Sequence, residues 1–117
     1  DLKRFEEKFG EGAKLAQEAG FDGVDIKCCH GYLFNELLSA TEREGVYGGS
    51  LRNRTRLYFD CIDAVKKAVG EDVFVTTRLN ACDCFPYPFG FGVDENSNID
   101  LSETKLIIKE LYENNAE

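Results

Sequence analysis

The sequence has few basic residues for its size. Its 14 lysines and arginines stand against 22 aspartates and glutamates, which leaves a net charge of −8. Nucleic acids are bound through concentrated positive charge, so this composition argues against a nucleic-acid partner. Long apolar runs are missing too, and none approaches the ~20 residues of a membrane span. The first residues, DLKRFEEKFGEG, are charged and amphipathic and therefore unlike a signal peptide. We expect no nucleic-acid partner and no membrane partner.

The cysteines lack the C-x-x-C spacing that is typical of zinc sites and thioredoxins. There are five of them: an adjacent pair (Cys28 and Cys29), a lone Cys61, and a C-x-C pair (Cys82 and Cys84). Without a secretion signal, we expect reduced thiols of a cytoplasmic protein and not a disulfide framework. The overall composition, 43% hydrophobic over 117 residues, suits one globular unit with a core.

The apolar pattern predicts five regular elements. Phe5, Phe9 and Ala13 recur at helical spacing near the start, although Gly10 and Gly12 allow a kink in that helix. In order, we expect a helix at 1–19, a strand at 23–27, a helix at 51–69 capped by Ser50, a strand at 73–79, and a helix from Asp100 or Ser102 to Asn114. The segment 32–39 is expected to be a loop or a single helical turn, and 80–99 a long aromatic loop.

Helices and strands alternate along the chain, which is the order of a parallel α/β protein. Both strands read as nearly continuous apolar runs, so we expect them to be buried on both faces. In the last helix we expect four apolar side chains to point inward: Leu101, Ile107, Ile108 and Leu111. Two strands cannot close such a sheet. We therefore interpret residues 1–117 as a single unit taken from a larger α/β domain.

Three stretches together resemble the Old Yellow Enzyme family of FMN-dependent ene-reductases, also called NADH:flavin oxidoreductases. They are AGFDGVDIKCCHGYLFNELLS at 19–39, YGGSLRNRTRLYFDCIDAVKKAVG at 47–70 and VFVTTRLN at 73–80. The most specific parts are H-G-Y-L, which begins at His30, and Y-G-G-S-L-x-N-R, which begins at Tyr47.

The resemblance implies an α/β fold that is a fragment of a (β/α)8 TIM barrel. It places the predicted strand at 24–27 fourth in the barrel and the one at 73–79 fifth. The resemblance therefore implies that the first three strands of the barrel, and the seventh and eighth with their phosphate-binding loops, lie outside this sequence.

The resemblance also implies roles for residues that follow the first strand. His30 matches the second residue of a His-x-x-His or His-x-x-Asn pair that hydrogen-bonds the carbonyl or nitro oxygen of the substrate. Lys27 stands at the first position of that pair and departs from the family. Tyr32 matches the residue that protonates the substrate's α-carbon, and a phenol with an unperturbed pKa of ~10 is neutral and has a proton to give. The alternatives are a histidine held in a polar pocket and a tyrosine that packs under the sheet.

Arg78 ends the second strand, and the resemblance places it against N1 and O2 of the flavin, where negative charge collects on reduction. The alternative is a structural ion pair with an acidic residue. No metal ligand is assigned, because a zinc site needs converging side chains, whereas the adjacent Cys28 and Cys29 diverge. Small residues commonly fill these two positions in the family, so we interpret the cysteines as fillers and keep metal binding as the less favoured alternative.

Two further segments have expected roles. The Y-G-G-S motif at 47–50 is interpreted as a turn into the next helix, whose Asn53, Arg54 and Arg56 are expected to hold loops in place. The aromatic loop at 85–91 is expected to form either a wall over the flavin and substrate or a simple cover for the edge of the barrel.

For the full-length protein, the resemblance implies an enzyme in which NAD(P)H reduces FMN and hydride passes to an electron-poor alkene or carbonyl substrate. The segment alone is expected to be inactive. Two alternatives are kept: a non-catalytic α/β module for ligand binding or assembly, and a relative of dienoyl-CoA reductase or amine dehydrogenase. The cysteines for the iron–sulfur cluster of that relative would lie outside these residues. Self-association into a homo-oligomer is left open.

Overall fold

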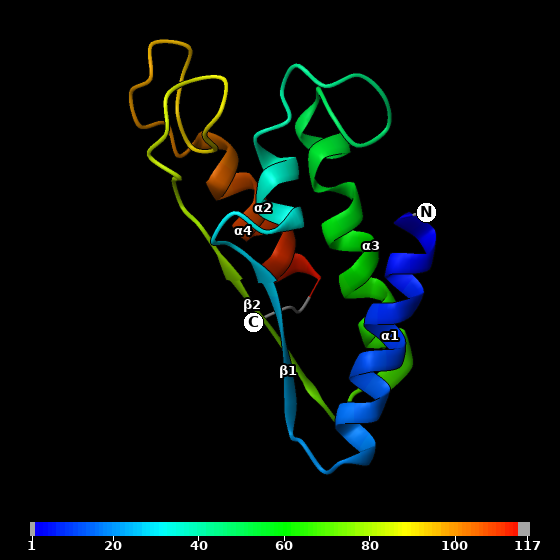
Figure 1. The fold of residues 1–117 in the computed structure, drawn as a ribbon. Helices are drawn as coiled ribbons and strands as arrows, with labels where there is room; N and C mark the ends of the chain where they lie inside the picture. Colours follow the sequence, from blue (N-terminus) through cyan, green and yellow to red (C-terminus); the bar gives the residue numbers. More distant parts are fainter. Residues whose placement is uncertain (1, 115–117) are drawn as a thin grey trace.

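The computed structural model describes residues 2–114 and contains four helices and two strands in that range. In chain order they are α1 (Leu2–Glu18), β1 (Gly23–Cys28), α2 (Leu33–Leu38), α3 (Leu51–Val69), β2 (Phe74–Leu79) and α4 (Ser102–Glu113). The two strands lie side by side, with α1 and α3 packed together against them (Figure 1). The short helix α2 and the loop that follows β2 gather at the end where the strands finish (Figure 1). All five predicted elements are present, and the segment expected to be a loop or one helical turn forms α2.

The sheet has one covered face and one open face. The strands pair in parallel, with Gly23 opposite Phe74 at one end and Cys28 opposite Leu79 at the other. On the face toward the helices, Ile26 is 2% exposed. On the opposite face, Phe74 is 69% exposed. Within residues 2–114 the predicted burial is thus seen on one face of the sheet only, because the helices that pack on the strands all lie on that side.

The covered face packs against a continuous apolar stripe on α3. Tyr58, Cys61, Ile62 and Val65 of that helix are almost fully buried, as the helical spacing predicts. The helix α1, from Leu2 to Glu18, runs without interruption through Gly10. This residue is buried where α1 packs on α3, so its missing side chain serves close packing between the two helices.

The last helix is only half as predicted. Ile107 and Leu111 are buried, whereas Leu101 is 37% and Ile108 54% exposed. Successive helical residues point about 100° apart, so a face that buries Ile107 turns Ile108 away from the core. Asp100 lies just before the helix, and its carboxylate accepts a hydrogen bond from the backbone N–H of Ser102 at 2.9 Å, which lowers the pKa of Asp100. Within the part of the chain that is described, none of the helices combines the length and the apolar character needed to cross a bilayer.

The N-terminus of α3 is stabilised by a capping hydrogen bond, and its contribution to stability can be measured. Ser50 is the N-cap residue, and its hydroxyl accepts a hydrogen bond from the backbone N–H of Asn53 at 3.4 Å. Ser50→Ala should lower the free energy of unfolding by about 1 kcal/mol, and Ser50→Asp should retain it, because aspartate caps equally well. Chemical denaturation measures the difference. Asp63→Ala is the control, since Asp63 lies on the exposed surface of α3 and away from its cap. An equal loss in both alanine variants would contradict the capping role.

Candidate functional site

Lys27 and Arg78 lie next to each other on neighbouring strands, at the end of the sheet where both strands finish. The two residues are register partners, and the next partners, Cys28 and Leu79, are the last residues of the strands. Since paired residues in neighbouring strands point to the same side, Lys27 and Arg78 share the open face. Barrel enzymes place their catalytic groups at the carboxyl ends of strands. Two of the predicted site residues are thus brought together by the pairing of β1 with β2.

Tyr32 joins this group through a contact with Lys27. The Lys27 Nζ lies 3.7 Å from the centroid of the Tyr32 ring, a cation–π contact that attracts the ammonium to the ring face. Tyr32 is the residue that precedes α2, and its side chain is 62% exposed, so the alternative of an aromatic packed under the sheet is wrong. Among residues 2–114, no carboxylate lies within ion-pair distance of Lys27.

His30 lies in the turn between β1 and α2. Both His30 and Gly31 have positive φ values, of 60° and 67°, which turn the chain sharply away from the strand. A non-glycine residue seldom adopts this left-handed conformation, and such residues gather at functional sites. The backbone N–H of Gly31 donates a hydrogen bond to Asn35 Oδ1 at 2.8 Å, which holds the turn. His30 itself is exposed, so it is not a histidine buried in a polar pocket.

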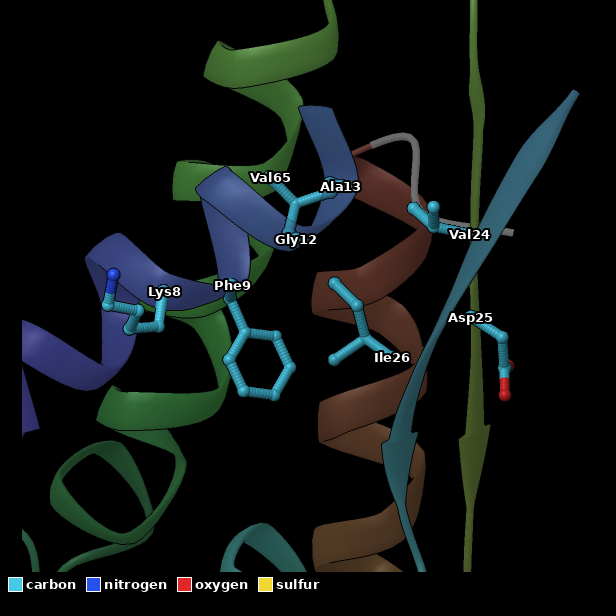
Figure 2. Close-up of a pocket in the computed structure, with 8 residues that line it drawn as sticks. All are labelled: Lys8, Phe9, Gly12, Ala13, Val24, Asp25, Ile26 and Val65. Carbon is cyan, nitrogen blue, oxygen red and sulfur yellow. The ribbon is translucent and has the colours of Figure 1, made fainter. Parts of the chain in front are cut away.

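Arg78 is paired with Asp25 on the open face. Its Nε donates a hydrogen bond to Asp25 Oδ2 at 2.6 Å, and the Arg78 side chain is 59% exposed. Figure 2 shows Asp25 pointing away from Ile26 and Phe9, which lie on the covered side of β1. A guanidinium has five N–H donors, so an ion pair with one carboxylate oxygen leaves donors for a second partner. The predicted ion pair and the predicted flavin contact are therefore compatible.

The groove drawn in Figure 2 does not belong to this group. It has a volume of about 300 Å³ and runs between α1 and β1. Mostly apolar side chains line it, including Phe9, Val24, Ile26 and Val65. None of the four predicted site residues lines the groove, and of the residues around them only Asp25, the partner of Arg78, does.

A polar network centred on Asp83 lies at the end of the sheet where the strands finish and was not predicted from the sequence. The Asp83 carboxylate accepts hydrogen bonds from Asn35 Nδ2 at 3.0 Å, from Asn80 Nδ2 at 2.8 Å and from the backbone N–H of Phe91 at 3.0 Å. Asn35 also accepts the bond from Gly31, so the network links the His30 turn, the end of β2 and the aromatic loop. A polar Asn35 inside the apolar run L-F-N-E-L-L was the one local signal for it.

Removing the charge from Asp83 should loosen this end of the sheet. In Asp83→Asn one acceptor oxygen is lost, and the amide NH2 that replaces it faces either the NH2 donors of Asn35 and Asn80 or the backbone N–H of Phe91. We expect a loss of about 1–3 kcal/mol in the free energy of unfolding, the scale for a polar group left without its partner. Chemical denaturation tests this, with Asp63→Asn on the exposed surface of α3 as the control. A loss no larger than that of the control would show that the network does not stabilise the fold.

The basic residues of α3 hold loops in place, as predicted. The buried Arg54 donates hydrogen bonds to the carbonyl oxygens of Gly49 and Leu38 and forms an ion pair with Glu103. It thereby ties α2 and the following loop to α4. The other two predicted residues also reach loop carbonyls: Asn53 Nδ2 donates to Gly45 at 3.3 Å and Arg56 Nε to Val46 at 2.9 Å.

The Y-G-G-S motif is structural for a steric reason. A Cβ at Gly48 would lie 2.4 Å from the carbonyl oxygen of Arg43, a distance that would force the backbone apart. The glycine therefore lets the loop fold back closely on itself before Ser50 begins α3.

Cys28 and Cys29 are 0% and 3% exposed and fill space beside the end of β1, in agreement with the filler interpretation. In the described range 2–114, no three His, Cys, Asp or Glu side chains converge as metal ligands. The aromatic loop is mixed: Phe91 is 2% exposed and packs into the core, whereas Phe85 and Phe89 are 64% and 78% exposed. The two exposed rings are compatible with both expected roles of this loop, a wall over the flavin and substrate and a cover for the edge of the barrel.

Comparisons with known proteins agree with this geometry. Residues 1–106 match the sequence model of the NADH:flavin oxidoreductase / NADH oxidase family. An NADPH dehydrogenase of Bacillus licheniformis is 46% identical over 85 residues, which are 71% of this chain and 24% of that protein. A cinnamate reductase of Clostridium sporogenes is 40% identical over 83 residues, which are 68% of this chain and 12% of that protein.

Solved structures of this family are also similar to the chain. The crystal structure of Old Yellow Enzyme from Pichia sp. superposes with a TM-score of 0.78 at 33% identity, over 96% of this chain and 29% of that one. The chain thus spans less than a third of the length of each of these proteins. The predicted fold class, part of a (β/α)8 barrel, is confirmed. Since the family match covers residues 1–106, the chain belongs to the NADH:flavin oxidoreductase / NADH oxidase family.

Proposed function

We propose that the full-length protein is an FMN-dependent oxidoreductase that takes hydride from NAD(P)H and reduces an electron-poor alkene conjugated to a carbonyl group. One observation carries the proposal: Lys27, Tyr32 and Arg78 are gathered on the open face at the carboxyl ends of two parallel strands. FMN, when bound, supplies the hydride chemistry. The protein's own residues bind, orient and supply a proton.

The residues present fit a flavin. Arg78 is a cation on a face that no element in residues 2–114 covers, with donors left over from its ion pair with Asp25. We assign it to the N1 and O2 edge of the ring, where its positive charge stabilises negative charge. Asp25 holds the guanidinium in place and so restricts its rotamers.

Lys27 and His30 would orient the substrate by donating hydrogen bonds to its carbonyl oxygen. A neutral histidine donates one such bond, whereas a lysine ammonium offers three and a full charge. Tyr32 would deliver its hydroxyl proton to the α-carbon as hydride reaches the β-carbon. Its exposed ring, held by the Lys27 ammonium at 3.7 Å, supports this placement at the mouth of the site.

Lys27 also suggests a substrate class. Because a positive charge replaces the usual neutral donor, we propose that the enzyme prefers substrates that carry a carboxylate or a strongly basic oxygen. The similarity to a cinnamate reductase, whose name refers to an unsaturated carboxylate, supports this preference. A cytoplasmic location is also part of the proposal, and the five free cysteines among the described residues support it.

The experiment is to incubate the purified full-length protein with NADH or NADPH and either cinnamate or a simple enone. Mass spectrometry of the product measures whether the alkene gains two hydrogens, and the cofactor absorbance measures how fast. Saturated product from both substrates, with the carboxylate favoured, is the expected result. Cofactor oxidation that depends on oxygen alone and leaves both alkenes intact would contradict the proposed reaction. Iron bound in a fixed ratio to the protein would favour the relatives that carry an iron–sulfur cluster.

A further inference from the structure

The C-x-C pair places two thiols in contact. The Sγ atoms of Cys82 and Cys84 are 3.3 Å apart, and the backbone N–H of Cys84 donates a hydrogen bond to Cys82 Sγ at 3.1 Å. A disulfide has an S–S distance of ~2 Å, so closing this pair requires a movement of little more than 1 Å. The proposed function uses neither cysteine.

The local backbone directs both sulfurs to the outside. Cys84 has a φ of 58°, a left-handed conformation that bends the chain back toward Cys82. Between them, Asp83 is held inward by Asn35 and Asn80 through the hydrogen bonds described above. Cys84 is exposed and Cys82 is partly exposed, so a small molecule in solution can reach the pair.

The other three cysteines differ from this pair in their burial. Cys28, Cys29 and Cys61 are all buried, and burial raises the pKa of Cys61 to about 12 and the pKa of Cys28 still further. The thiolate is the form that reacts, so the raised pKa keeps Cys28 and Cys61 inert, and burial keeps all three out of reach of a disulfide in solution. The backbone N–H of Cys84 donates to Cys82 Sγ and would stabilise a thiolate there, so we assign the first attack to Cys82.

We propose that Cys82 and Cys84 form a redox-active dithiol that exchanges with small-molecule disulfides. The Cys82 thiolate attacks one sulfur of the small disulfide and expels the other sulfur as a thiolate, which leaves a mixed disulfide on Cys82. Cys84 then loses its proton to solvent, attacks Cys82 Sγ and expels the second small thiolate. Overall, the two cysteine thiols are oxidised to one intramolecular disulfide, and the small disulfide is reduced to two thiols.

Oxidised glutathione is the probe, and the full-length protein is the reagent. Free thiols are counted by alkylation after denaturation, and the modified peptides are identified by mass spectrometry. The count for the five cysteines of this sequence should fall to three, and a single peptide containing Cys82 and Cys84 should lose two hydrogens without gaining glutathione. Dithiothreitol should restore all five thiols.

Two single variants serve as matched controls for each other. In Cys84→Ser the glutathione adduct should persist on Cys82, because the second attack is impossible. In Cys82→Ser the glutathione adduct should form more slowly, on Cys84, because the sulfur that accepts the hydrogen bond from the Cys84 N–H has been removed. A stable glutathione adduct on the unmutated pair, or no reaction there, would overturn the proposal. Oxidation of Cys28, Cys29 or Cys61 as fast as the pair would overturn it as well, since the selectivity rests on their burial.

Discussion

Tyr32→Phe in the full-length protein should slow the reaction of the reduced enzyme with an enone by ~10²-fold or more, the scale for losing a positioned acid. Reduction by NAD(P)H should be nearly unchanged, because that step needs no proton from Tyr32. Phenylalanine keeps the ring, and therefore the contact with Lys27, so the substitution removes the hydroxyl and little else. A selective effect on one half of the reaction is thus the signature of a proton donor.

Stopped-flow spectroscopy of the flavin measures the two halves separately. The matched control is Tyr112→Phe, since this tyrosine is 82% exposed on α4 and lies in no predicted site. It should leave both rates unchanged. If Tyr32→Phe slowed both halves of the reaction equally, Tyr32 would have a structural role and the assignment would be wrong.

Lys27→Ala should weaken carboxylate-bearing ligands by ~1.5–3 kcal/mol, the scale of a hydrogen bond to a charged group. This corresponds to a Kd about 10- to 150-fold higher. Lys27→His restores a neutral donor, so it should shift the preference back toward simple enones. Lys27→Arg keeps the charge and should keep the carboxylate preference, although its planar donor group fits a different geometry.

Ligand titrations and competition between cinnamate and an enone provide the ranking for each variant. Lys67→Ala controls for a general change in charge, because Lys67 is an exposed lysine on α3 and is distant in sequence from the strand ends. A ranking that stays the same as in the unmutated protein in both the alanine and the histidine variants would mean that Lys27 does not face the substrate.

The sequence predicted most of the fold because its local signals agree with the packing. Ser50, the stripe on α3 and the β-branched strands each act within a few residues, and all three appear where expected. The hydrogen bonds from Arg54 and Arg56 to loop carbonyls were also predictable, because the Y-G-G-S motif marks the loop.

Features that depend on distant partners escaped prediction. Asp83 is 48 residues from Asn35 in the sequence, so although a polar Asn35 in an apolar run indicates a buried polar contact, nothing local identifies Asp83 as its partner. The open face of the sheet was missed although Val24, Asp25, Ile26 and Lys27 alternate between apolar and polar residues, which is the pattern of a strand with one covered face. The contact of Lys27 with Tyr32 was not predictable for a similar reason. The chain between them turns at His30 in a left-handed conformation, and a histidine at that position does not indicate such a turn.

The flavin content of the purified full-length protein tests the central claim most directly. The visible absorbance shows whether a flavin is bound, and mass spectrometry of the released cofactor identifies it. We predict about one FMN per chain, retained through purification, and a weaker hold on FMN in Arg78→Met because a cation that stabilises its charge is lost. A colourless protein that does not take up added FMN would contradict the account and favour a non-catalytic module.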